Sequence, residues 1–452
     1  MNQEIKPSTN SLRQYWLFFT GQLLSILGSN VVQFSLIWWL TLTATEDPRY
    51  ADKTATILGL ASVAGFAPFI ITIMFSGVLI DRWNRKKVII ISDGMQAVFT
   101  GIMMLMFYYK VMDIPYYLIL LALRGIANGF HNPAIQAIIP LMVPRDKRTK
   151  VNSLEYLFNG VIGLIGPAIG AYLLFLFGIK NIATLLWIDI ITFLIAIIPV
   201  LKIHIPDITK EKRESKEKKS FKTEFKEGIS FIQKQDGLLS LLITFTAINI
   251  LVTPVFMLLP LIVVDPDLLN SDIKLFATLL IAVQVGSILG PAILSVKPNL
   301  LGSNPRGVAV GQGVIYLSIY LLIYGIVINN FWILIISMIL FGFGGPFANI
   351  PSQTIWQSVV PAELQGRVMT VRQLIAWTMI PVSQLIGGIL ADLFGVIWLF
   401  SVSLIIGVLF LIYAWFMTAF PNVEKKLGID NKNDLISEMD SSIEESGSNP
   451  VV

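Results

Sequence analysis

The sequence predicts an all-α membrane protein with twelve transmembrane helices in two pseudo-symmetric bundles of six. Three observations predict this class. Hydrophobic residues make up 55% of the 452 residues and charged residues only 14%, whereas a soluble domain carries about one quarter charged residues. At ~20 apolar residues per crossing, the chain has room for about a dozen spans. A long segment also recurs later in the chain, which indicates two halves built alike.

The repeat relates residues 124–178 to residues 341–395 without a gap. Direct comparison finds 15 identities in the 55 aligned positions, among them Gln136 with Gln353. Each copy consists of two long apolar segments joined by a short charged loop. In a bilayer, two such copies predict two similar helical bundles around a site near the midplane.

The apolar segments, taken in order, predict twelve spans. The first eleven residues are polar, and the apolar run that follows is too long for a signal peptide, so we expect it to remain as the first span. The expected spans are 12–43, 54–80, 87–110, 115–143, 152–178, 182–201, 238–263, 273–296, 307–329, 331–360, 369–391 and 396–420.

The spans divide the chain into two bundles, a linker and a tail. In the linker, Phe221, Phe225, Ile229 and Ile232 recur at helical spacing, which predicts an interfacial amphipathic helix; a solvated linker with a few apolar residues is the alternative. The tail is acidic and Ser-rich, which is typical of disorder. The expected domains are an N-terminal six-helix bundle over 1–201, a cytoplasmic linker over 202–237, a C-terminal six-helix bundle over 238–421 and a disordered cytoplasmic tail over 422–452.

The basic residues predict the orientation. With both termini cytoplasmic, 27 of the 33 Lys and Arg lie on the cytoplasmic side, five lie outside, and Arg124 lies within a span. This distribution satisfies the positive-inside rule and predicts a multi-pass protein of the plasma membrane. It also accounts for the pI near 9, so we expect a lipid bilayer rather than a nucleic acid as the partner surface.

Polar side chains form stripes on every third span. Because such side chains are costly in hydrocarbon, they usually face a bundle interior or a wet cavity. The recurrence on spans 1, 4, 7 and 10 favours four helices that line one shared cavity, although hydrogen bonding between helices is the alternative. The candidate substrate-cavity residues are Gln22, Asn30, Gln33, Arg124, Asn128, His131, Asn132, Gln136, Asn249, Asn349, Gln353 and Gln357.

Several charged residues within the expected spans need partners. Arg124 and Asp189 lie at a similar depth from the external side, so we expect a buried ion pair. Asp93 and Glu155 lie close to the cytoplasmic ends of spans 3 and 5, where salt bridges of a cytoplasmic gate are the simpler account and a proton carrier is the alternative. Glu155 is the repeat equivalent of Arg372, so such bridges are expected to join the halves, through Asp81 with Arg372 and through Glu155 with Arg306 or Lys297.

A compact motif connects spans 2 and 3. It runs from Gly77 through Asp81 and Arg82 to Arg85 and Lys86, so that an acid ends one helix and four basic residues follow. The acid can pair with the N-terminus of an opposing helix. The motif resembles the G-x-x-x-D-R-x-x-R-K signature of the major facilitator superfamily, and the resemblance implies that these residues belong to the cytoplasmic gate of the major facilitator fold.

Span 5 carries a second motif, built from Gly163, Gly166, Pro167 and Gly170. Small residues at this spacing let helices approach closely, and the proline can bend the span. The motif resembles the G-x-x-x-G-P-x-x-G core of the superfamily's antiporter motif, which implies export; a generic packing face is the alternative.

Within the superfamily, residues 1–200 are similar to macrolide-efflux and related small-molecule exporters. The similar stretches include Gln33–Trp38, Phe130–Pro133 and Ile139–Pro144. The resemblance implies export of hydrophobic or amphipathic small molecules, drugs or macrolides among them, with the proton-motive force as the energy source. An exporter or importer of an endogenous metabolite or siderophore is the alternative, and a membrane sensor is a further one.

No enzymatic chemistry is expected. The chain has no Cys and only two His, and it lacks the H-E-x-x-H, G-x-S-x-G and phosphate-binding glycine motifs. We therefore expect neither a catalytic centre nor a metal site nor a cofactor, and we expect a monomer.

Overall fold

The computed structural model of the chain is helical throughout its described part, which comprises residues 9–136, 138–144, 147–203, 221–297 and 300–426. Apolar runs of this length form helices in lipid because a helix satisfies every backbone hydrogen bond within one segment. The N-terminal half contains α1 (Thr9–Glu46), α2 (Thr54–Arg82), α3 (Arg85–Tyr108), α4 (Ile114–Gln136), α5 (Ile139–Met142), α6 (Arg148–Phe177) and α7 (Ile182–Lys202), with the short turns η1 (Ala51–Lys53) and η3 (Ile179–Asn181).

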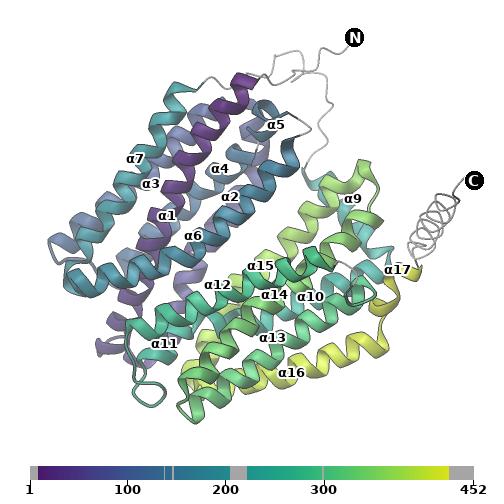
Figure 1. Cartoon of the computed structure of the whole chain (residues 1–452). Helices are drawn as coiled ribbons and strands as arrows, with labels where there is room; N and C mark the ends of the chain where they lie inside the picture. The colour runs from purple at the N-terminus through teal and green to yellow at the C-terminus, as the bar shows by residue number, and fades with distance from the viewer. Residues whose placement is uncertain (1–8, 137, 145–146, 204–220, 298–299, 427–452) are drawn as a thin grey trace, which may run out of the picture.

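The C-terminal half repeats this series. It contains α10 (Asp236–Met257), α11 (Leu259–Val264), α12 (Ile273–Val296), α13 (Asn304–Val327), α14 (Phe331–Val359), α15 (Ala362–Phe394) and α16 (Val396–Met417), followed by η4 (Phe420–Asn422) and α17 (Val423–Lys426). Figure 1 shows the two halves as two bundles of long helices. In the described chain, eleven helices are long and apolar enough to cross a membrane; α4, whose middle holds Arg124, Asn128 and His131, is the twelfth expected span.

Two expected spans are broken near one end. Span 4 was expected to continue to residue 143, but α4 ends at Gln136 and α5 begins at Ile139. Span 7 is divided in the same way between α10 and α11. In both cases a proline, Pro140 or Pro260, occupies the first turn of the second helix. Because a proline lacks the N–H that would continue the preceding helix, it fits best where a new helix begins.

The repeat is visible in the packing of equivalent glycines. A Cβ on Gly125 of α4 would lie 2.4 Å from the Gly65 carbonyl oxygen of α2, and one on Gly342 of α14 would lie 1.8 Å from the Val283 carbonyl oxygen of α12. Both distances are below any real contact. The same identity, 217 residues apart, therefore produces the same close helix crossing in each half, which explains why glycine stands at both positions.

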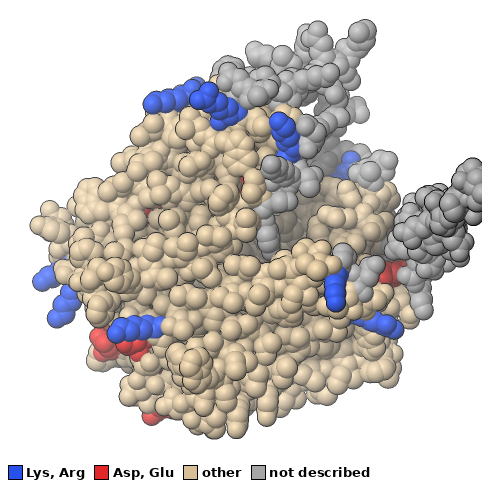
Figure 2. Space-filling model, in the orientation of Figure 1, with Lys and Arg blue, Asp and Glu red and all other residues tan. Residues whose placement is uncertain are grey.

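The two faces of the bundle differ in charge. We call the face that carries the start of α1 and the end of α16 the terminal face, and the other the opposite face. Figure 2 shows a broad uncharged surface between these faces, with most of the visible Lys, Arg, Asp and Glu at its margins. Large apolar side chains such as Phe75, Trp332 and Phe416 are exposed on the helices. An apolar band of this kind fits the hydrocarbon region of a bilayer.

The segment between the halves contains a further helix, α9 (Phe221–Gln233). It packs along α15, where Glu227 accepts a hydrogen bond of 2.6 Å from Arg367. Phe225 reaches the cluster that Phe69 of α2 forms with Leu374 of α15. A helix is therefore present where the amphipathic pattern predicted one, and it contacts both halves. Residues 204–220 and 427–452, which include most of the predicted linker charges and of the predicted disordered tail, lie outside the described residues.

Candidate functional site

The buried charges of the N-terminal half lie in two clusters between α1, α3, α4 and α7. In the first cluster, Nη2 of Arg124 lies 2.9 Å from Oδ2 of Asp189, and the Asp189 side chain is fully buried. Ser29 donates to Asp189 Oδ1 at 2.7 Å, and Thr100 donates to Asp189 Oδ2 at 3.0 Å. The structure thus brings together the two residues that the sequence paired, and it adds two hydroxyl donors that the sequence analysis did not name.

The second cluster joins His131 of α4, Asp93 of α3 and Gln22 of α1. His131 Nε2 lies 2.8 Å from Asp93 Oδ1, and the Gln22 amide donates to Asp93 Oδ2 at 3.4 Å. All three side chains are buried. Asp93 was expected to form a gate salt bridge near the cytoplasmic end of its span; the structure instead buries its side chain beside His131, within the N-terminal half, where α3 packs against α4 and α7.

The two clusters share one spacing. Ser29 follows Gln22 by seven residues, Thr100 follows Asp93 by seven, and Arg124 precedes His131 by seven. Seven residues are two helical turns, about 10 Å along the axis, and they return to the same helix face. The same four-helix interior therefore holds two acid–base pairs, one above the other.

The predicted gate residues lie at the terminal face. Glu155 accepts a hydrogen bond from Tyr15 of α1, and in the described chain it forms no ion pair with Arg306 or Lys297. Lys86 donates to the backbone carbonyls of Leu201 and Ile203, at 2.7 and 2.9 Å, and thereby ties the start of α3 to the end of α7.

Arg372 has neutral partners in the described chain. It donates to Gln353 at 2.7 Å and to Ser352 at 3.5 Å, and its guanidinium lies 5.2 Å from the centre of the Trp356 ring. The predicted pair of Asp81 with Arg372 involves one of residues 77–82, whose side chains, those of Gly77, Asp81 and Arg82 among them, lie outside the described residues. Arg85 is engaged in a contact at the start of α3.

The candidate cavity residues divide by exposure. Gln22 and His131 are buried in the second cluster, and Asn30, Asn128 and Asn249 are half-buried. Asn30 donates to its own helix at Ile26, and Asn249 donates weakly to the carbonyl of Ala376 at 3.4 Å. The remaining amides of the stripes are exposed although they lie within long helices: Gln33 on α1, Asn132 and Gln136 on α4, and Asn349, Gln353 and Gln357 on α14.

The two halves contact each other mainly away from the terminal face. Asp392, in the last turn of α15, accepts hydrogen bonds from the backbone N–H groups of Ala55 and Thr56 at the start of α2, at 2.9 and 2.7 Å. About two turns farther from the opposite face, along α2 and α15, the Ser62 hydroxyl donates to Gln384. Asp392, Ser62 and Gln384 were not among the predicted site residues; an acid at the end of a helix, where it opposes the helix dipole, was the available signal.

Further contacts between the two halves join α1 and α6 of the N-terminal half to α12 of the C-terminal half. Phe34 and Trp38 of α1 stack against Phe276 of α12, with ring centres 5.1 and 5.6 Å apart. In the antiporter-like motif, a Cβ on Gly163 would lie 3.1 Å from the Gln284 side chain of α12 and one on Gly166 2.7 Å from Asn30. Gly170 packs in the same way against Phe34, and Pro167 lies inside the same helix. The glycines of this motif therefore allow close packing at the junction of α6 with α1 and α12.

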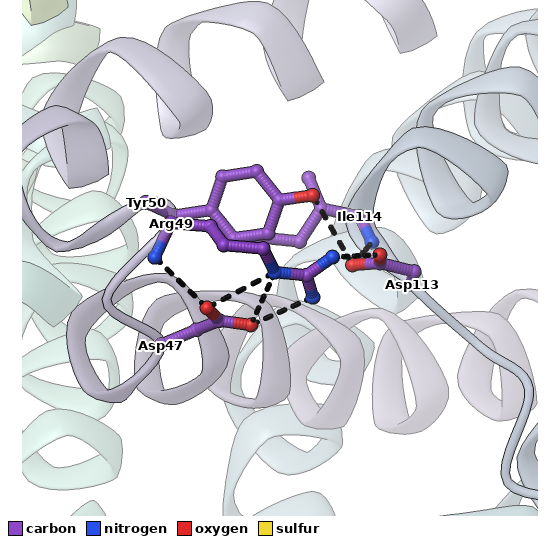
Figure 3. A network of polar contacts seen from close by, with 5 residues as sticks. All are labelled: Asp47, Arg49, Tyr50, Asp113 and Ile114. Atoms are coloured by element: carbon purple, nitrogen blue, oxygen red, sulfur yellow. Dashed lines mark hydrogen bonds and ion pairs between the residues drawn. The ribbon is translucent and has the colours of Figure 1, made fainter.

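Two loops of the N-terminal half are joined at the opposite face. Arg49 lies between Asp47, whose Oδ2 is 2.7 Å away, and Asp113, whose Oδ2 is 2.8 Å away (Figure 3). Asp113 also accepts a hydrogen bond from the Tyr50 hydroxyl at 3.3 Å. Hydrogen bonds from Arg49 lower the pKa of the Asp47 carboxyl. Arg49 is 60% exposed, so this network holds the loops together without contributing much to the stability of the fold.

The chain resembles known transporters in sequence and in fold. Residues 18–383 match the profile of the Major Facilitator Superfamily. Macrolide efflux protein A of Streptococcus pyogenes is 26% identical over 386 residues, 85% of this chain and 90% of that protein. The Staphyloferrin A transporter of Staphylococcus aureus is 23% identical over 427 residues, 93% of this chain and 99% of that protein. The crystal structure of a bacterial homologue of the iron transporter ferroportin in the inward-facing state superposes with a TM-score of 0.65 at 12% identity, over 89% of this chain and 98% of that one.

Proposed function

The chain belongs to the major facilitator superfamily, and from this premise we propose that it is a secondary active exporter of hydrophobic or amphipathic small molecules. In this proposal, proton antiport drives the export, and the two halves alternate access to a central cavity. The protein lies in the plasma membrane with both termini in the cytoplasm, so that the terminal face is the cytoplasmic one.

The observation that carries the proposal is the exposure of amide side chains within membrane-length helices. Gln33, Asn132, Asn349 and Gln353 are exposed on α1, α4 and α14. Asn349 bonds only to its own helix at Gly345, and Gln353 accepts from Arg372, so each of these amides keeps polar atoms without a protein partner. Such atoms are too costly to place against lipid tails, so the residues are expected to face water. Amides on helices from both halves support one aqueous cavity between them.

The contacts between the halves support the direction from which that cavity is entered. The hydrogen bonds of Asp392 with α2, and the stacking of Phe34 and Trp38 on Phe276, lie toward the opposite face. Contacts at one end of two bundles are expected to leave the other end as the entrance. We therefore assign this conformation to the state that takes up substrate from the cytoplasm.

A second candidate is export of a specific endogenous metabolite or siderophore, and one observation favours it. Arg372 is half-buried, and its partners in the described chain are an amide, a hydroxyl, a thioether and an aromatic ring, all neutral. A guanidinium that has no carboxylate partner among the described residues and lies next to Gln353 favours an anionic group on the substrate. The relative named as a Staphyloferrin A transporter, whose match spans 93% of this chain, is consistent with this class.

The test is accumulation of ethidium, a fluorescent dye, and of radiolabelled erythromycin, a macrolide, in energised cells that express the protein. Each compound is measured with and without a protonophore, and beside Asp81→Asn as a variant of the gate motif. We expect lower accumulation that the protonophore abolishes. Equal accumulation with and without the protein for both compounds and for a wider drug panel would refute drug export and favour the endogenous substrate.

A further inference from the structure

We propose that Asp93 and His131 form the site that carries the coupling proton. This inference rests on the proposed function and adds the residues through which the proton-motive force acts. It follows from a comparison of the two buried clusters, which share α1, α3 and α4 and differ in one property. In the described chain, the first cluster leaves no fully buried side-chain atom without a partner, and the second cluster does.

The first cluster is neutralised by a permanent charge. Arg124 cannot release its proton at physiological pH, so its partner Asp189 is held as a carboxylate. Both Asp189 oxygens also accept hydroxyl hydrogen bonds, from Ser29 and from Thr100. A carboxylate with these partners has no reason to gain a proton, and a guanidinium has no means to lose one. This pair is therefore structural.

The second cluster has incomplete hydrogen bonding. Asp93 Oδ1 and His131 Nε2 are 2.8 Å apart, but neither atom makes a well-aligned hydrogen bond in the described chain. The Gln22 carbonyl oxygen also lacks a partner there. Each unpaired buried polar atom costs about 1–3 kcal/mol. A change of protonation that rotates the imidazole or the carboxyl group can satisfy these atoms, so two arrangements of the cluster are available.

The chemistry of the pair suits a carrier. Imidazole gains and loses a proton near neutral pH, unlike guanidinium. Asp93 and His131 together can hold one proton more or one fewer, with Gln22 able to donate to a carboxylate or accept from a carboxyl group. The transfer changes only an O–H or N–H bond: the pair takes up one proton from outside and releases one proton to the cytoplasm for each substrate molecule exported.

No other charged group reaches this pair in the described chain. Of the packed helices, α7 offers Asp189, which is engaged by Arg124 two turns away, and Lys202 at its end. Toward the terminal face the next titratable groups are Tyr15, seven residues before Gln22, which donates to Glu155 of α6, and Lys86, which donates to backbone carbonyls. Asp93 lies about 12 Å from the start of α3, so a proton released there has a short path to the cytoplasmic face.

The first test is independent of any substrate. The chain has only two histidines, His131 and His204, so protein labelled with ¹⁵N-histidine in lipid nanodiscs gives two sets of ring signals, which His204→Gln assigns. We expect the pH at which His131 changes protonation to differ by at least about one unit between wild type and Asp93→Asn, because a carboxylate in contact shifts such an equilibrium by about 1–3 units. His204 is the internal control, and Asp47→Asn is the control variant. A His131 titration that Asp93→Asn leaves unchanged would overturn the proposal.

The second test separates coupling from transport. In inverted vesicles with an imposed pH gradient, we expect Asp93→Asn and His131→Gln to reduce ethidium or erythromycin uptake at least tenfold while each variant still exchanges the same compound across the membrane without a gradient. Retained gradient-driven uptake would contradict the assignment, as would uptake driven by a sodium gradient alone. If wild type moves neither compound, the proposed drug export fails, and the histidine titration still decides the proton site.

Discussion

The hydrogen bonds of Asp392 predict how the protein can be shifted between its two states. Asp392 of α15 caps the start of α2, at 2.9 and 2.7 Å from two backbone N–H groups of the other half. These N–H groups have no partner within their own helix. An acid in the last turn of α15 is unfavourable for its own helix and favourable for the N-terminus that it meets. The contact therefore stabilises the state in which the opposite face is closed.

The magnitude can be worked from this geometry. A hydrogen bond to a charged group contributes about 1.5–3 kcal/mol, and a carboxylate at a helix N-terminus adds about 0.3–1 kcal/mol. Asp392→Asn keeps one carbonyl acceptor and loses the charge and the second acceptor. We expect the closed state to lose about 1–2 kcal/mol, which lowers the ratio of closed to open molecules by a factor of about 5–30.

The chain lacks cysteine, so spin labels can be placed without removing native thiols. Lys110→Cys and Asn329→Cys put one label on an exposed loop of each half at the opposite face. Pulsed electron paramagnetic resonance then measures the distance distribution between them. With Asp392→Asn we expect a longer-distance population at the opposite face and a shorter-distance population for Lys147→Cys with Lys297→Cys at the terminal face.

The matched control for this experiment is Asp113→Asn. Asp113 also bonds across two segments at the opposite face, but both belong to the N-terminal half (Figure 3). The Asp113→Asn variant should therefore leave both distance distributions unchanged. Unchanged distributions in a folded Asp392→Asn protein would refute the reasoning, because they would mean that the cap does not bias the two states.

Three further results are expected. Replacing Arg124 by Leu or Asp189 by Asn should destabilise the protein by about 3–5 kcal/mol, since each change leaves one buried charge unpaired. Size-exclusion profiles after heating measure the fraction that stays folded. A charge-swapped double variant that recovers no more folded protein than either single variant would contradict the pairing. Gly388→Leu should open the opposite face, because a Cβ there would lie 2.4 Å from a backbone oxygen of α2; the same spin labels report it, with Gly345→Leu, where a Cβ meets nothing within 4 Å, as the control. Phe175→Asp, at the repeat equivalent of Asp392, should add a second cap at the start of α12 and shift the labels toward the closed state, and a shift toward the open state would show that the equivalence does not extend to this contact.

The sequence was sufficient for the spans because each is a local property. Long apolar runs, the turns between them and the repeat together predicted twelve helices, most of them within a few residues of their bounds; the end of α4 and the start of α15 each differ by seven residues. The breaks after Gln136 and Met257 were missed because proline is also tolerated inside these helices, for example Pro167 within α6. Whether a proline ends a helix depends on neighbours that replace the lost hydrogen bond.

The pair of Arg124 and Asp189 was predictable because only one acid lay at the matching depth. The pair of His131 and Asp93 was not predicted, because it depends on how α3 is rotated about its axis against α4. One sequence signal was available: the spacing of seven residues from Gln22 to Ser29 and from Asp93 to Thr100 places a second polar set two turns below the first. Asp392 could not have been found in this way, since its partner is the backbone of the other half.

The charged residues of the two clusters and of the cap lie at positions where the repeat is not preserved. Equivalent glycines preserve the same close helix crossings in both halves, so the repeat maintains the scaffold. In contrast, Arg124 and His131 correspond to Phe341 and Ala348, and Asp392 corresponds to Phe175. The C-terminal half therefore has no counterpart of the two buried acid–base pairs, and the N-terminal half has no counterpart of the carboxylate cap. If both halves held the same groups, protonation would act on both equally. The proposed proton site lies in one half, and the cap comes from the other. In this proposal, a change of charge at Asp93 and His131 moves the N-terminal helices, α2 among them, against a partner on α15, and this asymmetry would couple the proton to the conformational change.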